Sequence, residues 1–227
     1  MTIGENTSFV YTKRKGMHIT SEPAILYFGT PVVLVSTVNE DGSYNLAPIS
    51  SVFWLGWRCV IGMGAVSKTV ENLLRTKHCV LNLPSVHEAA QVNALALTTG
   101  SDPVPEGKKL KGYQTVRNKF ERAGFTPEAS LHVASPRVQE CPVHLEAEVA
   151  TVHGLAEDDP AKAGRIVTIE LRIVKVHVDH TILADGEPNR IDPDKWRPLM
   201  MSFQKFYGLG KQVHASTLAE IPEHLYR

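Results

Sequence analysis

The chain has 227 residues, with 24 Lys and Arg balanced by 24 Asp and Glu, and 43% of its residues are hydrophobic. The balanced charge argues against a nucleic-acid partner, because nucleic-acid-binding proteins present a clustered positive surface. No run of residues approaches the roughly 18 apolar positions of a membrane-spanning helix, so no membrane partner is expected. The length and the apolar fraction favour one domain with a sizeable core.

The number and the spacing of the cysteines indicate the cellular compartment. Cys59, Cys79 and Cys141 are widely spaced and odd in number, and the first two lie within apolar strand patterns. Buried free thiols are the expected state, which indicates a reducing environment. The N-terminus also lacks an apolar signal core, so we predict a cytoplasmic protein.

In chain order, the first elements are an arm and a short helix. The first twenty residues are polar and mixed, and they predict an arm that must pack on another surface to be ordered. Pro23 suits the first turn of a helix, so residues 24–28 are predicted to be helical, with Gly29 ending the helix.

A block of three strands follows. Residues 32–38 form a β-branched run typical of a buried strand, and Asp41-Gly42 is a strong hairpin signal. Residues 44–51 return as a second strand, in which Pro48 indicates an interruption or a sheet edge. Residues 58–63 predict the third strand.

The third strand leads to a helix start at Ser67-Lys68-Thr69. Ser67 is a suitable N-cap, and an N-terminus of this kind offers unpaired N–H groups to an anion. Lys68 would add a charge and Thr69 a hydroxyl. The alternative is an ordinary capped surface helix with a solvated lysine; the neighbouring hydroxyl-rich strand favours a phosphate site.

The middle of the chain mixes strand and helix signals. Residues 79–83 predict a strand, and a capping box at residues 85–88 predicts a helix that continues to about Leu97. Residues 98–107 are expected to be loop. Within residues 108–136, a short helix is predicted at 117–123; this segment either shapes access to a site or is an ordinary connection.

Two long strands and an aromatic tail complete the chain. Residues 143–152 alternate, which predicts a half-buried strand with His144 and Glu146 on its polar side. Residues 166–178 predict a longer strand, with Ile173 and Lys175 on one face. The rings after residue 185 predict a tail that packs across a neighbouring subunit.

Motifs of other chemistries are incomplete. His177 and Asp179 share a strand face but His180 points away, so no metal site is predicted. Gly62-Met63-Gly64 lacks the third glycine and the βαβ setting of a dinucleotide fingerprint. No side chain is predicted to act as a catalytic acid, base or nucleophile.

Several short segments spread over most of the chain carry a resemblance to a known family. They are Ser36-Thr37, Asp41-Gly42, residues 45–53, Ser67-Lys68-Thr69 with Asn72, residues 79–84, residues 177–180, residues 191–193 and residues 197–199. In these segments the chain resembles the flavin reductase-like proteins. That family consists of FMN-binding split barrels, including reductase components of two-component monooxygenases and flavoredoxin-type electron carriers.

The resemblance implies a mainly β fold, a Greek-key split β-barrel with peripheral helices, in one domain over residues 1–227. Its core would cover about 22–180, and residues 181–227 would form a C-terminal extension. The resemblance further implies FMN as cofactor and NAD(P)H as co-substrate, in a flavin reductase that transfers hydride to the flavin N5 atom. Alternatives are an FMN electron carrier and a flavoenzyme acting on a small organic substrate.

The resemblance also implies partners and a binding site. It predicts a homodimer, with a monooxygenase component or another redox protein as a further partner. The cofactor-binding residues that it implies are Asn45, Ala47, Pro48, Ser50, Ser51, Val52, Ser67, Lys68 and Thr69.

Overall fold

One antiparallel sheet dominates the computed structural model, which describes residue 16 and residues 18–226. Most of the predicted N-terminal arm therefore lies outside the described residues. The seven strands of the sheet run, in spatial order, β3 (Tyr44–Ile49), β2 (Val33–Val38), β6 (His78–Leu83), β11 (Val143–Leu155), β12 (Ile166–Val178), β5 (Arg58–Gly64) and β4 (Val52–Leu55).

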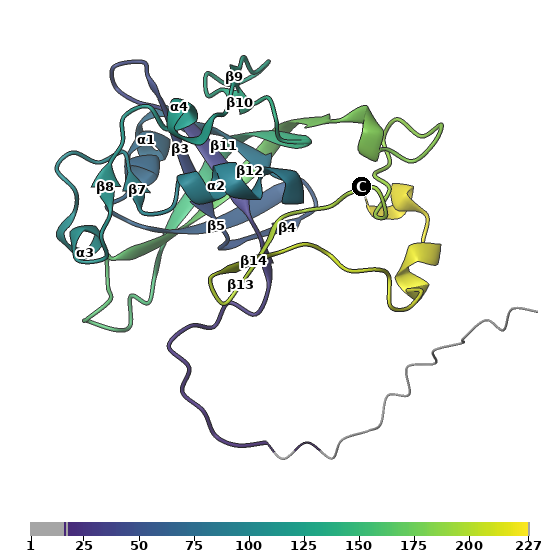
Figure 1. Cartoon of the computed structure of the whole chain (residues 1–227), viewed down its shortest axis with the longest axis horizontal. Helices are drawn as coiled ribbons and strands as arrows, with labels where there is room; N and C mark the ends of the chain where they lie inside the picture. The colour runs from purple at the N-terminus through teal and green to yellow at the C-terminus, as the bar shows by residue number, and fades with distance from the viewer. Residues whose placement is uncertain (1–15, 17, 227) are drawn as a thin grey trace, which may run out of the picture.

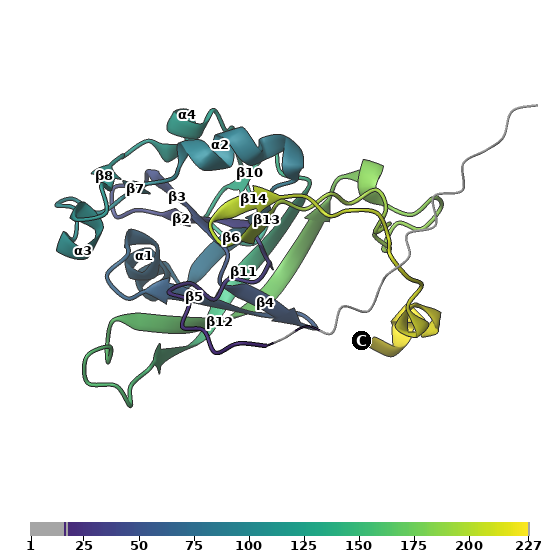
Figure 2. The same cartoon turned by 60° about the horizontal axis from the view of Figure 1, so that its bottom comes forward.

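The sheet curls but does not close, and its opening is the split of the barrel (Figure 2). The two edge strands, β3 and β4, follow each other in the chain, so only Ser50 and Ser51 connect one edge to the other. Pro48 lies in edge strand β3, where its missing N–H removes no bond between two central strands. The predicted fold class, a mainly β split barrel with peripheral helices, is confirmed.

The hairpin between β2 and β3 forms where the sequence predicts it. Val38 pairs with Tyr44, and Gly42 occupies the turn with φ of +81°, a conformation that favours glycine. The Asp41 carboxylate accepts a hydrogen bond from the Ser43 backbone N–H at 3.0 Å. The turn therefore fixes the register in which edge strand β3 pairs with β2.

Short helices surround the sheet (Figure 1). They are α1 (Lys68–Thr76), η1 (Val86–Glu88), α2 (Ala89–Ala94), α3 (Glu106–Lys109), α4 (Lys119–Ala123), η2 (His180–Ile182), η3 (Thr217–Glu220) and η4 (Glu223–Tyr226). The remaining strands are β1 (Thr30–Pro31), β7 (Thr98–Thr99), β8 (Gln114–Thr115), β9 (Pro127–Glu128), β10 (Arg137–Val138), β13 (Met200–Ser202) and β14 (Lys205–Tyr207). The predicted capping box is present at Ser85 and Glu88, and α4 ends at Gly124 as expected.

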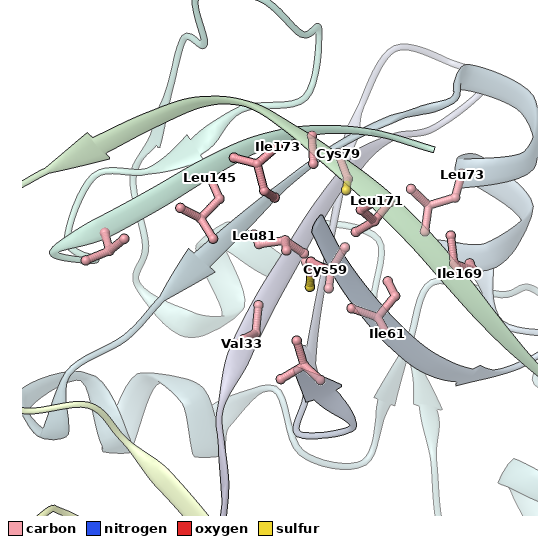
Figure 3. Close-up of a cluster of buried hydrophobic side chains, with 14 of the residues drawn as sticks. Val33, Cys59, Ile61, Leu73, Cys79, Leu81, Leu145, Ile169, Leu171 and Ile173 are labelled. Atoms are coloured by element: carbon pink, nitrogen blue, oxygen red, sulfur yellow. The ribbon is translucent and has the colours of Figure 1, made fainter. Parts of the chain in front are cut away.

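Two apolar cores lie on opposite faces of the sheet. The first core fills the inside of the barrel, where side chains of β2, β5, β6, β11 and β12 meet Val70 and Leu73 of α1 (Figure 3). The second core joins β2 and β3 to α2 and α4 and includes Leu199 from the C-terminal extension. Helix α1 is thus fixed to the first core, and α2 and α4 to the second.

Two strand predictions are corrected by the structure. The predicted polar side of β11 is buried: Glu146 is 0% exposed, because its carboxylate accepts the N–H groups of Leu131 and His132 from a covering loop. In β12 a bulge separates Ile173, which pairs with Ala147, from Lys175, which pairs with Glu146. Lys175 therefore does not share the core face of Ile173.

The predicted helix over residues 24–28 is wrong. This segment is irregular, and Leu26 and Phe28 are 68% and 72% exposed. A helix of one turn is marginal without an apolar surface to bury it. Although the Phe28 ring contacts the Phe203 ring with 4.9 Å between their centres, the Leu26 and Phe28 side chains stay largely exposed.

The C-terminal extension packs on its own barrel as far as β14. Thr30 pairs with Met201, Met201 pairs with Phe206, and Leu199 is 2% exposed. The predicted packing of the whole tail on a second subunit does not hold for this part. Residues 208–226 extend away from the sheet (Figures 1 and 2).

The structure also shows the state of the cysteines and the lengths of the helices. All three cysteines are buried and unpaired, as expected. Within residues 18–226, the helices are all too short or too polar to cross a membrane.

Candidate functional site

A cavity of about 570 Å³ opens where the barrel is split. Edge strand β3, the Ser50-Ser51 connection and the end of β5 line one side, and the start of α1 lines the next. Residues 95–100, α3 and α4 provide the opposite wall, and Met201 and Phe206 of the C-terminal extension complete it. Segments far apart in the sequence therefore meet around one space.

Most of the residues that the resemblance implies lie around this cavity. The lining includes Asn45, Ala47, Pro48, Ser50, Ser51, Ser67, Lys68 and Thr69. Val52 is not among the lining residues, because its side chain points into the first core and is 7% exposed. The structure thus gathers both predicted segments, the β3 return and the helix start, at one site.

The start of α1 presents hydrogen-bond donors beside the cavity. Ser67 is the N-cap, and its hydroxyl accepts the N–H of Val70 at 3.3 Å. Within the described part of the chain, no acceptor binds the N–H groups of Lys68 and Thr69. These two donors and the positive end of the helix dipole suit an anion.

The charge of Lys68 is already balanced. Its ammonium lies 2.9 Å from a carboxylate oxygen of Glu40 and 2.8 Å from one of Glu71. The hydrogen bond from Lys68 is the largest of the causes that lower the pKa of Glu40 to about 2. Lys68 is therefore held between two acidic side chains and offers little net charge to a ligand.

A buried amide positions the hydroxyl of Thr69. Asn45 donates from Nδ2 to the Thr69 hydroxyl at 2.9 Å and to the Thr37 hydroxyl at 3.3 Å. Because the Thr69 oxygen accepts this bond, its own proton remains available to an acceptor in the cavity. The Oδ1 atom of Asn45 is buried without a partner among the described residues.

Three lysines that sequence reasoning missed also line the cavity, namely Lys108, Lys111 and Lys119. Lys108 of α3 donates to the Thr99 hydroxyl at 3.3 Å, and Lys119 of α4 is almost fully buried. All three belong to the segment 108–136, for which the sequence predicts either a role in access or an ordinary connection. Their clustering in that segment was a visible signal, but the sequence does not show that α3 and α4 fold over β3.

The side of the cavity away from α3, where β13 and β14 lie, is apolar (Figures 1 and 2). Met201 and Phe206 line it there and pack in one apolar cluster with Val92 and Leu95. At its mouth, the Tyr27 hydroxyl is 2.8 Å from the Ser51 hydroxyl, which ties the N-terminal segment to the split. The cavity thus combines an apolar end with an end rich in donors.

The polar group at the end of β12 has a structural role. The His177 Nε2 atom lies 2.6 Å from the buried Glu146 carboxylate, and Asp179 accepts the N–H of Thr181 as the N-cap of η2. Among the residues that the structure describes, no three His, Cys, Asp or Glu side chains are placed to hold a metal ion.

The fold and this cavity define a split-barrel protein with a ligand-sized cavity at the split, and comparison with known proteins gives its family. The sequence profile of the flavin reductase like domain matches residues 25–210, so the chain belongs to the flavin reductase-like family. An uncharacterized protein of Bacillus subtilis, YdfE, is 35% identical over 192 residues, which cover 85% of this chain and 89% of that protein.

Solved structures share the fold at low sequence identity. Flavoredoxin of Desulfovibrio vulgaris (Miyazaki F) superposes with a TM-score of 0.70 at 18% identity, covering 90% of this chain and 100% of the other. Nitrilotriacetate monooxygenase component B from Bacillus cereus superposes with a TM-score of 0.68 at 18% identity, covering 88% and 100%.

Proposed function

We propose that this protein binds FMN in the cavity at the split and works as an NAD(P)H-dependent flavin reductase. The observation that carries the proposal is the two-ended character of the cavity. Unpaired N–H groups at Lys68 and Thr69 and two lysines lie at one end, and Met201 and Phe206 lie at the other. FMN has matching ends, a planar ring system and a terminal phosphate.

The size and the chemistry of the cavity fit this cofactor. Its volume of about 570 Å³ lies within the roughly 300–1,000 Å³ typical of sites for ligands of this size. The start of α1 and the Thr69 hydroxyl supply donors to phosphate oxygens. The orphaned Oδ1 of Asn45 and the hydroxyls of Ser50 and Ser51 are suited to hydrogen bonding with a polyhydroxyl chain or a polar ring edge.

When bound, the flavin supplies the hydride-accepting chemistry, and the protein needs no nucleophile of its own. The residues of this chain bind and orient. Backbone groups at the Ser50-Ser51 connection line the cavity and would hold the polar edge of the ring, where hydrogen-bond donors would stabilise negative charge on a reduced ring. The aromatic ring of Phe206 offers a stacking surface at the apolar end.

A second candidate function is electron transfer without a reductase step, in which FMN exchanges electrons with a partner protein. The structural likeness to a flavoredoxin motivates it, although that likeness shows the fold alone. A flavoenzyme that reduces a small organic substrate directly is a third version. Three unpaired buried thiols suit a reducing compartment such as the cytoplasm for any of them.

One experiment separates the reductase from the electron carrier. FMN is added to the purified protein under anaerobic conditions, and NADH or NADPH is then supplied. A reductase accelerates the loss of flavin visible absorbance in proportion to protein concentration. A pure carrier binds FMN but leaves that rate at the value measured without protein.

We further propose that the protein is a homodimer. Side chains of β4 and the turn that follows it, Phe53, Leu55 and Trp57, are apolar and more than half exposed at 53%, 74% and 58%. They lie on the edge of the split, beside the cavity wall formed by β5. A second copy that covered this edge would remove the apolar patch from water.

A further inference from the structure

Lys119 is buried without a counterion. Its side chain, at the first position of α4, is 3% exposed and lines the cavity. Within residues 18–226, no hydrogen bond or ion pair is made by its ammonium. Lysine is almost never fully buried unless it is paired, so this position requires an explanation.

A second lysine shares this end of the cavity. The Lys108 ammonium donates to the Thr99 hydroxyl and lies 5.6 Å from the centre of the Tyr113 ring, and neither contact neutralises its charge. Burial, reinforced by the nearby charge of Lys108, lowers the pKa of Lys119 to about 8. The two like charges therefore destabilise each other when the cavity holds only water.

Nearby carboxylates do not compensate these two charges. Glu40 and Glu71 both bind Lys68, and Glu121 accepts from Asn118 on the outer side of α4 at 2.8 Å. The other ionisable side chains that line the cavity are Lys111, Tyr27 and Tyr113, and none of them is a carboxylate. The described residues thus leave one uncompensated positive region in a chain whose formal net charge is zero.

We propose that Lys108 and Lys119 form an anion subsite that binds a phosphate monoester of the ligand in this cavity. The inference rests on the proposed function, because that function defines what else the ligand contains. A phosphate monoester carries a charge of about −1.5 to −2 at neutral pH, which two ammonium groups match. Lysine binds such groups as a point charge.

The subsite adjoins the donors of α1. Gly100, which follows Thr99, packs so closely on Lys68 that an added Cβ atom would lie 3.1 Å from Lys68 Cγ. The Lys108 ammonium on Thr99 therefore lies next to the helix start. One phosphate placed between the two walls would meet N–H groups from α1 and ammonium groups from α3 and α4.

Two phosphate monoesters could supply this group, namely the terminal phosphate of FMN and the 2′-phosphate of NADPH. The experiment has an arm for each. Dissociation constants for FMN and riboflavin are measured by flavin fluorescence for the native protein, K119M, K108M and K109M. Lys109 is exposed on the same helix as Lys108 and does not line the cavity, so K109M is the matched control.

Loss of one charge-assisted bond predicts a roughly 10- to 100-fold weaker FMN affinity for K119M and K108M. Riboflavin affinity should change less than about twofold, and K109M should bind like the native protein. If FMN is unaffected but KM for NADPH rises while KM for NADH does not, the subsite serves the dinucleotide. Equal losses for FMN and riboflavin, or no selective change in either arm, would overturn the proposal.

A measurement without flavin separates this proposal from the proposed function. Inorganic phosphate should raise the melting temperature of the native protein and of K109M more than that of K119M. If riboflavin and FMN fail to bind but this difference persists, the subsite stands and the flavin function is wrong. If flavins bind and phosphate stabilises all variants equally, the subsite is wrong.

K119M also tests whether the lysine merely supports the fold. Because the variant removes an unpaired buried charge and keeps a flexible apolar side chain, its melting temperature without ligand should equal or exceed that of the native protein. A structural lysine would show the opposite. A fall in melting temperature together with equal losses for both flavins would therefore reject the subsite.

Discussion

Gly100 and Asn45 approach each other across the cavity wall so closely that a Cβ atom on Gly100 would lie 2.7 Å from the Asn45 Oδ1 atom. This distance is too short for an undisturbed side chain at position 100. Glycine there therefore allows the segment that follows β7 to pack directly against Asn45 of β3. The same approach places Gly100 over the Lys68 side chain at the start of α1.

The first prediction concerns this contact. G100A should destabilise the protein by about 1–3 kcal/mol, the usual range for overpacking, and should weaken FMN binding by displacing Asn45. G107A is the matched control, because no atom lies within 4 Å of a Cβ at Gly107. Urea unfolding and an FMN titration check both effects. Equal behaviour of the two variants would contradict the assigned role of Gly100.

The second prediction concerns Lys68. Since Glu40 and Glu71 already neutralise it, K68M should weaken FMN binding less than K119M does. E40Q should improve FMN affinity, by at most about fivefold, because it removes one of the two charges that balance Lys68 and because the half-exposed Glu40 is partly screened by water. Fluorescence titration of the three variants measures this order. A larger loss for K68M than for K119M would place the phosphate on Lys68 instead.

The third prediction is a pH dependence of stability. The pKa of Lys119 falls from 10.5 to about 8 on folding. Between about pH 8 and pH 10.5, Lys119 therefore carries its proton in the unfolded chain but has lost it in the folded chain. The free energy of unfolding of the ligand-free protein should rise with pH over this range. The expected gain is about 3 kcal/mol relative to K119M, which lacks this titration. Urea unfolding of both proteins at neutral and alkaline pH checks it, and parallel pH profiles would refute it.

The fourth prediction concerns the C-terminal extension. Deleting residues 197–227 removes the buried Leu199 and strands β13 and β14, and should unfold the second core. Deleting only residues 209–227 should leave the melting temperature nearly unchanged and tests whether this part joins two subunits. Light scattering reports the oligomeric state. A native protein that is a monomer would contradict the dimer itself.

Local patterns were sufficient to predict most elements of this fold. Residues 32–38, Asp41-Gly42 and the N-cap Ser67 determine their own conformations, because β-branching, turn chemistry and capping act over a few residues. The helix predicted over residues 24–28 is absent because a one-turn helix depends on a surface that buries it, and Leu26 and Phe28 remain largely exposed.

The remaining features depend on distant segments. Glu146 looks like a solvent-facing residue of an alternating strand, and only the loop that carries Leu131 and His132 makes it buried. Lys108 and Lys119 look like surface charges of a connection until α3 and α4 are placed over the edge of β3. The wall formed by β3 and the start of α1 could be predicted from the sequence, and the wall that carries Lys108 and Lys119 could not.

The most direct test of the central claim is anaerobic flavin reduction. The protein, with FMN bound or supplied, is mixed with NADH or NADPH, and flavin visible absorbance is followed with time. We expect FMN to bind and to lose its absorbance at a rate proportional to protein concentration. FMN that fails to bind, or that is reduced no faster than in the absence of the protein, would contradict the assignment as a flavin reductase.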